Sequence, residues 1–84
     1  MIREADFSNL FLKTLNNLEN EQKERVKSKI KQLLIDPTIG TPLKGDLKPL
    51  FKQRVGKFRI LYKFDESKVY FVMLNLRKKV YKRK

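Results

Sequence analysis

The sequence predicts a single α+β domain, spanning residues 1–84, with the element order β-α-α-β-β-β. Apolar residues recur at helical spacing before Pro37, whereas after it they alternate with other residues as in strands. Helices that precede a run of strands typically cover one face of their sheet. We therefore expect a small, mostly antiparallel sheet with two N-terminal helices on one face.

The N-terminal part begins with a short strand over residues 2–7 and continues into a helix. Asp6 or Ser8 offers the side-chain oxygen that caps a helix start. Spacings of four and three then place three apolar residues on one face of this helix: Phe11, Leu15 and Leu18.

A second helix is predicted from Asn20, as N-cap, to about Asp36. Glu21 and Glu24 lie in its first turn, where the helix dipole favours acidic groups. Its end follows from Pro37, because a proline disfavours helical geometry at the preceding residue. The apolar face of this helix consists of Val26, Ile30, Leu33 and Leu34.

The rest of the chain is interpreted as a loop followed by three strands. Three prolines and two glycines punctuate residues 37–49, which we predict to be irregular. The strands are expected at 50–55, 58–64 and 68–76, with turns at 56–57 and 65–67. The last segment is apolar on both parities, which is typical of a central strand covered on both faces.

A formal net charge of +12 is the dominant global property of the chain. Such a charge repels itself unless an acidic partner is near, so nucleic acid, an anionic membrane surface or an acidic protein would suit it. No apolar run is long enough to cross a membrane, and no signal peptide is evident. The absence of cysteine is compatible with the cytoplasmic location that we expect.

In each of the first two predicted strands after the loop, the cations alternate with the residues expected to face the core. Lys52 and Arg54 alternate with Phe51, Gln53 and Val55, and Arg59 alternates with the aromatic positions of the next strand. Because strand side chains alternate between faces, one sheet face would be apolar and the other cationic. A guanidinium group suits planar, bidentate contact with phosphate.

Three segments give the sequence a family resemblance: "PLKGDL", "FKQRVGKFRILY" and "FVMLNLRKKVY". Together with "DFSNLFLKTLNNL", they resemble the RelE/ParE superfamily of toxin–antitoxin toxins. The resemblance implies a compact, microbial-ribonuclease-like fold. It also implies a cognate acidic, RelB-like antitoxin. We expect no cofactor, and no metal because the sequence offers no cysteine and no clustered set of acids.

The superfamily has two functional branches. RelE-like members are implied to be endoribonucleases that cut mRNA in the ribosomal A site and inhibit translation, whereas ParE-like members are implied to inhibit DNA gyrase without catalysis. The resemblance assigns the RelE-type catalytic positions to Lys52, Arg54, Arg59, Arg77 and Tyr81. Where many relatives read "GHR" this chain reads "NLR", so a frequent histidine is missing.

The absence of histidine excludes a mechanism with a pair of histidines as acid and base. What remains is attack of an RNA 2′-hydroxyl on the adjacent phosphate, with Arg54 and Arg59 holding the developing charge. Lys52 is the candidate general base, and Arg77 would assist the leaving oxygen. Tyr81 would stack on a base, orient it or relay a proton.

Structural interpretations remain open for each of these residues. Lys52 and Arg54 could be solvated sheet residues, Arg59 an ion-pair former, Arg77 part of a basic tail and Tyr81 a packing residue. A plain basic RNA-binding module also remains an alternative to both toxin branches. Further contacts with RNA or the ribosome are expected from Lys57, Lys63, Lys78, Lys79, Lys82, Arg83 and Lys84.

Overall fold

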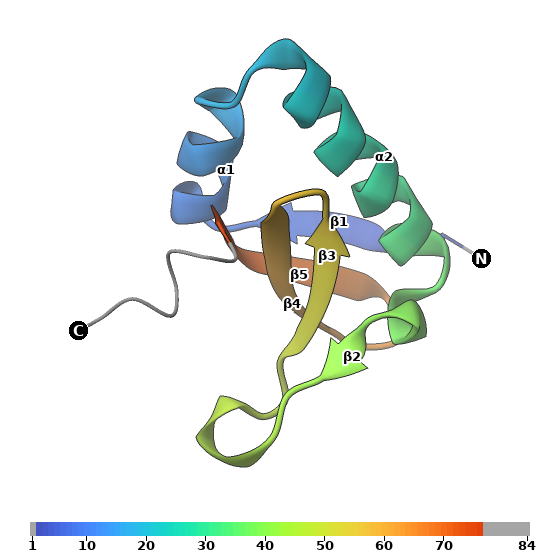
Figure 1. Cartoon of the computed structure of the whole chain (residues 1–84). Helices are drawn as coiled ribbons and strands as arrows, with labels where there is room; N and C mark the ends of the chain where they lie inside the picture. The colour runs from blue at the N-terminus through green and yellow to red at the C-terminus, as the bar shows by residue number, and fades with distance from the viewer. Residues whose placement is uncertain (1, 77–84) are drawn as a thin grey trace.

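The computed structural model describes residues 2–76 (Figure 1). The elements are β1 (Glu4–Phe7), α1 (Asn9–Asn16), α2 (Asn20–Ile35), β2 (Thr41–Pro42), β3 (Phe51–Val55), β4 (Phe58–Phe64) and β5 (Lys68–Leu76). Short 3-10 turns, η1 (Pro37–Ile39) and η2 (Gly45–Leu47), flank β2. The predicted elements are confirmed, whereas the segment predicted as irregular also contains β2 and these turns.

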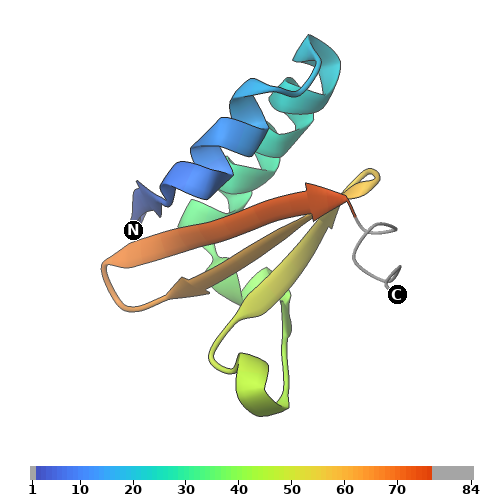
Figure 2. The same cartoon turned by 90° about the vertical axis from the view of Figure 1, so that its left-hand side faces the viewer.

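The five strands form one sheet in the order β1-β5-β4-β3-β2. β1 runs parallel to β5, and every other neighbouring pair is antiparallel, so the sheet is mostly antiparallel, as predicted. Both helices lie on one side of this sheet (Figure 2). None of the helices within residues 2–76 combines the length and the apolarity needed to cross a membrane.

Ser8 is the N-cap of α1 and also joins this helix to the sheet. Its Oγ accepts a hydrogen bond from the Phe11 amide at 3.0 Å and donates one to the Val72 carbonyl at 2.7 Å. The hydroxyl therefore satisfies one of the amides that a helix start leaves without a partner. Of the two predicted caps, the structure selects Ser8.

The start of α2 differs from the prediction by one residue. Asn20 is already helical, and the extended N-cap position belongs to Glu19, whose side chain makes no capping hydrogen bond. The dipole-favoured acid in the first turn is Glu21. The predicted end is confirmed: Asp36 is the C-cap, and its carboxylate accepts a hydrogen bond from the Thr38 amide as the chain enters η1.

The core lies between the helices and one face of the sheet. α1 and α2 contribute Phe11, Leu15, Val26, Ile30 and Leu33, and the sheet contributes Val55, Phe58, Ile60, Tyr62, Val69, Phe71 and Leu74. All of these side chains are buried. The aromatic parity of β4 therefore packs on the helices, as the alternation predicts.

The last strand is an interior strand between β1 and β4, as predicted, but its second face is only partly covered. β5 lies one position from the sheet centre, and Tyr70, Val72 and Met73 on or beside its second face are only partly buried. The apolar residues on both parities have another cause. Leu61 pairs with Met73 and Tyr62 with Phe71, so Val72 is an extra residue at a β-bulge. A bulge reverses the alternation, and the core positions change from odd to even numbers.

Tyr62 anchors the segment between α2 and β3. Its buried hydroxyl donates a hydrogen bond to the Pro37 carbonyl at 2.6 Å. Burial raises the pKa of this phenol to about 12, because desolvation disfavours the phenolate. The Gly40 backbone passes so close that a Cβ there would contact the Tyr62 hydroxyl and lie 2.7 Å from the Lys52 carbonyl oxygen.

Candidate functional site

The candidate site is built on the β3–β4 hairpin, whose register is fixed by a two-residue turn. Gly56 occupies the first turn position with φ +59°, and Lys57 has a negative φ. This combination is typical of a type II′ turn, which matches the twist of a hairpin. Val55 then pairs with Phe58, and Arg54 pairs directly with Arg59.

Three cations share the face of this hairpin that points away from the helices. Side chains of directly paired residues, such as Arg54 and Arg59, begin about 5 Å apart at their Cβ atoms. Lys52 precedes Arg54 by two residues, or about 7 Å along the strand. Arg54 is exposed, whereas Lys52 and Arg59 are half-buried. The predicted clustering of these three residues is thus present in the backbone register.

The same face continues onto β5, with residues that sequence reasoning did not select. Asn75 pairs with Arg59, and Met73 pairs with Leu61. The Asn75 amide donates to the Met73 sulfur at 3.2 Å. The bulge at Val72 determines that these side chains share a face with Arg59, and no simple alternation in the sequence would have identified them.

A hollow of about 410 Å³ lies beside Lys52 and Arg54. It is lined by Ile39, Thr41, Lys52, Gln53 and Arg54. Within the part of the chain that the structure describes, β2 pairs with β3 at Phe51 and Lys52 and does not extend alongside Gln53 and Arg54. The hollow therefore lies at this edge of the sheet, next to Lys52 and Arg54.

Two predicted contact residues lie at opposite ends of the hairpin. Lys57 is exposed at the turn, beside Arg54 and Arg59 in sequence. Lys63 is exposed at the far end of β4, where its Nζ lies 5.7 Å from the Tyr70 ring centroid. Arg77, Tyr81 and the five basic residues Lys78, Lys79, Lys82, Arg83 and Lys84 lie outside the described residues.

Asp65 lies away from the cation cluster. Asp65 follows β4, six residues or about 20 Å along the strand from Arg59. Hydrogen bonds from the Ser67 and Lys68 amides and the Tyr70 hydroxyl lower the pKa of Asp65 to about 2. Within residues 2–76, no three acidic side chains gather as metal ligands would.

This geometry suits the recognition of an anion by a flat cationic surface. Two guanidinium groups at directly opposed positions can share one phosphate, each through planar, paired hydrogen bonds. Lys52 adds an ammonium group one step away on the same face. The face can thus hold a nucleic-acid backbone and concentrate positive charge around one phosphate.

Comparison with protein families gives a match over almost the whole chain. A family model described as the ParE-like toxin of type II bacterial toxin–antitoxin systems matches residues 7–83. No curated protein sequence matches the chain significantly.

Solved structures with the same fold belong to proteins named RelE, RelBE2 and YafQ. The RelBE2 toxin–antitoxin complex of Mycobacterium tuberculosis contains a chain with TM-score 0.82 and 23% identity, covering 92% of this chain and 100% of its own. The isolated E. coli RelE toxin gives TM-score 0.77 and 26% identity over 94% and 90%. E. coli YafQ gives TM-score 0.72 and 19% identity over 95% and 99%. These likenesses confirm the predicted α+β fold.

Proposed function

We propose that this chain, which belongs to the ParE-like toxins of type II bacterial toxin–antitoxin systems, acts as a RelE-like endoribonuclease. Its substrate would be mRNA held in the A site of the ribosome, and the consequence would be inhibition of translation. The observation that carries the proposal is the placement of Lys52, Arg54 and Arg59 on one face of the β3–β4 hairpin. A purely inhibitory binding protein has no need of this cation set, which the resemblance assigns to the RelE branch.

The proposed reaction is an internal transesterification. The 2′-oxygen of the RNA attacks the adjacent phosphorus, a 2′,3′-cyclic phosphate forms, and the bond from phosphorus to the 5′-oxygen breaks. Lys52 would take the proton of the 2′-hydroxyl. The departing 5′-oxygen, assisted by Arg77, would take a proton from water and become a 5′-hydroxyl. Arg54 and Arg59 would hold the negative charge that grows on the phosphate oxygens.

Ribosome dependence follows from what this site lacks. A lysine is a weak general base near neutral pH, and general acid–base catalysis is strongest for groups that titrate near the working pH. Much of the acceleration must then come from orientation, since an aligned attacking group is worth up to about 7–11 kcal/mol. The ribosome would supply that alignment by holding the mRNA against the cationic face.

The partner that we propose is a cognate, acidic, RelB-like antitoxin. The structural relative from M. tuberculosis is itself part of a toxin–antitoxin complex. A chain of net charge +12 has a strong electrostatic preference for an acidic protein. Binding of that protein would neutralise charge that otherwise opposes the compact state.

Primer extension on an mRNA that is being translated in vitro tests the proposal. The wild-type chain should produce new RNA ends at codon positions only when ribosomes are present. Arg59→Ala and Arg54→Ala should each reduce cleavage by about 100-fold or more, as removal of one oxyanion-type donor does. Lys44→Ala, a single-lysine change at an exposed position outside the face, is the matched control.

Variants at Arg77 and Tyr81 extend the same assay to the predicted residues beyond the described part of the chain. Arg77→Ala should reduce cleavage, and Tyr81→Phe should separate a role of the hydroxyl from stacking. Cleavage that survives both Arg59→Ala and Arg77→Ala would contradict the catalytic assignment.

A second function, inhibition of DNA gyrase without catalysis, is favoured by the description of the matching family as ParE-like. A supercoiling assay with purified gyrase distinguishes the two. Inhibition of gyrase together with unchanged RNA ends would assign the cationic face to docking, and salt-sensitive RNA binding with neither effect would indicate a plain RNA-binding module.

A further inference from the structure

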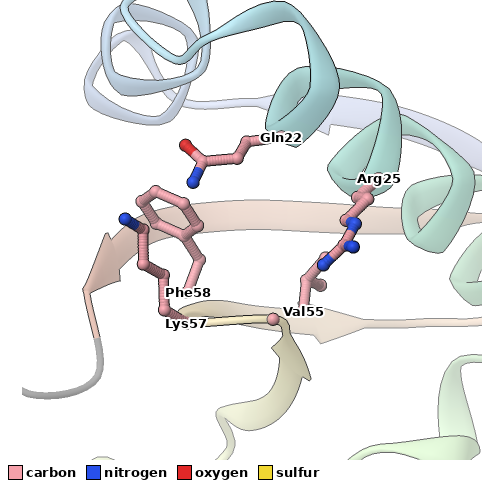
Figure 3. Close-up of a pocket in the computed structure, with 6 residues that line it drawn as sticks. Gln22, Arg25, Val55, Lys57 and Phe58 are labelled. Carbon is pink, nitrogen blue, oxygen red and sulfur yellow. The ribbon is translucent and has the colours of Figure 1, made fainter.

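A second recess lies on the other side of the same hairpin, between α2 and the β3–β4 turn (Figure 3). Figure 3 shows Gln22 and Arg25 extending from α2, with Lys57 and Phe58 facing them from the turn. The recess, which we call the hairpin slot, has a volume of about 240 Å³. Its lining consists of Gln22, Arg25, Val55, Gly56, Lys57 and Phe58.

The hairpin slot combines an apolar floor with a cationic rim. Val55 and Phe58 form the floor and belong to the buried core. Arg25 and Lys57 are exposed at the rim, and no acidic residue lines the slot. Within residues 2–76, the side-chain ion pair is between Lys27 and Glu24, and it involves neither Arg25 nor Lys57. Both charges are available to a ligand.

Size and chemistry define the occupant. A volume of about 240 Å³ is below that of typical pockets for drug-sized molecules, which begin near 300 Å³, and suits one side chain. An apolar floor favours an apolar side chain, and the two rim cations favour carboxylates beside it. A second copy of this chain, with net charge +12, is disfavoured by repulsion.

RNA fits the hairpin slot less well than a peptide does. Single-stranded RNA is held by bases stacked on accessible aromatic rings. Phe58 is only 7% exposed, which leaves too little of its ring for a base to stack face to face, although a smaller side chain can still contact it. An apolar floor also contributes nothing to the binding of phosphate, whose contacts are polar.

The hairpin slot and the cationic face are separated by the thickness of the sheet. Arg54 and Arg59 are neighbours in sequence of Val55 and Phe58, yet alternation turns them to the opposite face. A ligand in the slot therefore leaves Lys52, Arg54 and Arg59 uncovered.

We propose that the hairpin slot is an anchor for the antitoxin. One apolar side chain of an acidic segment lies on Val55 and Phe58, and flanking carboxylates bind Arg25 and Lys57. The inference rests on the partner proposed above and places its anchor on the helix side of the sheet. Recognition at the slot is thus separable from whatever covers the cationic face.

The test uses amide NMR spectra of the isotope-labelled full chain, titrated with a short synthetic peptide in which one leucine is flanked by glutamates. The expected shifts centre on Gln22, Arg25, Gly56 and Lys57. Replacing the leucine by serine should weaken binding by about 10- to 100-fold, because the burial of one apolar side chain is lost. Shifts centred on Lys52, Arg54 and Arg59 would overturn the proposal, as would equal binding of the serine peptide.

Two variants and one further ligand sharpen the result. Arg25→Glu or Lys57→Glu should weaken peptide binding by about tenfold or more, because each replaces an attractive pair with a repulsive one. Lys44→Glu makes the same charge change away from the slot and should have a small effect. A uridine oligonucleotide that shifts the slot amides as strongly as the peptide would overturn the proposal in favour of a phosphate site.

This test stands apart from the ribonuclease assay. It contains neither ribosome nor mRNA, so an inactive chain that binds the peptide in the slot would contradict the proposed enzymatic function alone. A chain that cleaves mRNA but gives no shifts at the slot would contradict the anchor alone.

Discussion

Gly40→Ala is expected to destabilise the chain although its backbone conformation suits alanine. Gly40 has φ −77° and ψ −179°, so no left-handed strain is involved. The obstacle is space: the new Cβ would contact the Tyr62 hydroxyl and lie 2.7 Å from the Lys52 carbonyl oxygen. Neither neighbour can move freely, because Tyr62 is fully buried and Lys52 is held by pairing with β4 and β2.

The loss of unfolding free energy expected for Gly40→Ala is the sum of two destabilising effects and one stabilising effect. Overpacking of a filled region costs about 1–3 kcal/mol. Displacing the Tyr62 hydroxyl from the Pro37 carbonyl leaves a buried polar group unsatisfied, at about 1–3 kcal/mol. Loss of unfolded-state freedom on replacing glycine returns about 0.4–1 kcal/mol. We expect a net loss of about 3 kcal/mol, which lowers Tm by about 12–24 °C for a domain of this size.

Urea unfolding followed by circular dichroism measures this loss. Gly45→Ala is the matched control, because Gly45 has φ +66° but open space around it. Its cost should be limited to about 1–2 kcal/mol of left-handed strain. Tyr62→Phe removes the hydroxyl, so Gly40→Ala should cost less in that background. A cost of Gly40→Ala no greater than that of Gly45→Ala would contradict the steric cause, as would equal costs in the two Tyr62 backgrounds.

Three further predictions concern single hydrogen-bonded groups. Because the pKa of Tyr62 is raised to about 12, the free energy of unfolding should keep its full contribution from this group below pH 10 and decrease as the pH rises towards 12. The absorbance of the phenolate should report this late titration. Tyr62→Phe should remove both the absorbance change and the decrease in stability. Because the pKa of Asp65 is lowered to about 2, the free energy of unfolding should keep its full contribution from this carboxylate above pH 4 and decrease as the pH falls towards 2. Between pH 4 and pH 2, the urea midpoint of Asp65→Asn should depend less on pH than that of the wild-type chain. Ser8→Ala removes the N-cap of α1 and should cost about 1–2 kcal/mol in urea unfolding, whereas Ser28→Ala, on the exposed face of α2, should be neutral or slightly stabilising.

Local signals in the sequence were sufficient for most of the elements. Pro37 ended α2 at the predicted residue, and Gly56 marked the hairpin turn. Both act through backbone geometry that depends on the residue itself. β2 could not be predicted in the same way, because two residues carry no periodicity and their pairing with β3 depends on the fold.

The candidate site was predictable to the extent that alternation governs it. Lys52 and Arg54 are two residues apart, and Arg54 and Arg59 pair across a two-residue turn. Their common face therefore follows from strand alternation together with the turn length. Asn75 and Met73 escaped prediction because the bulge at Val72 reverses the parity of β5. The bulge depends on how β5 pairs with β4, and β5 contains no glycine that would indicate its position in the sequence.

The β3–β4 hairpin couples the two surfaces proposed here through its register. Val55 and Phe58 turn inward to the core and the hairpin slot, while their neighbours Arg54 and Arg59 turn outward. A slip of one residue would exchange the two sets, burying guanidinium groups and exposing the slot floor. The same hydrophobic burial that stabilises the hairpin therefore holds its cations together against their mutual repulsion. In this way the core fixes Arg54 and Arg59 at directly opposed positions, which is the arrangement that the proposed binding of a phosphate requires.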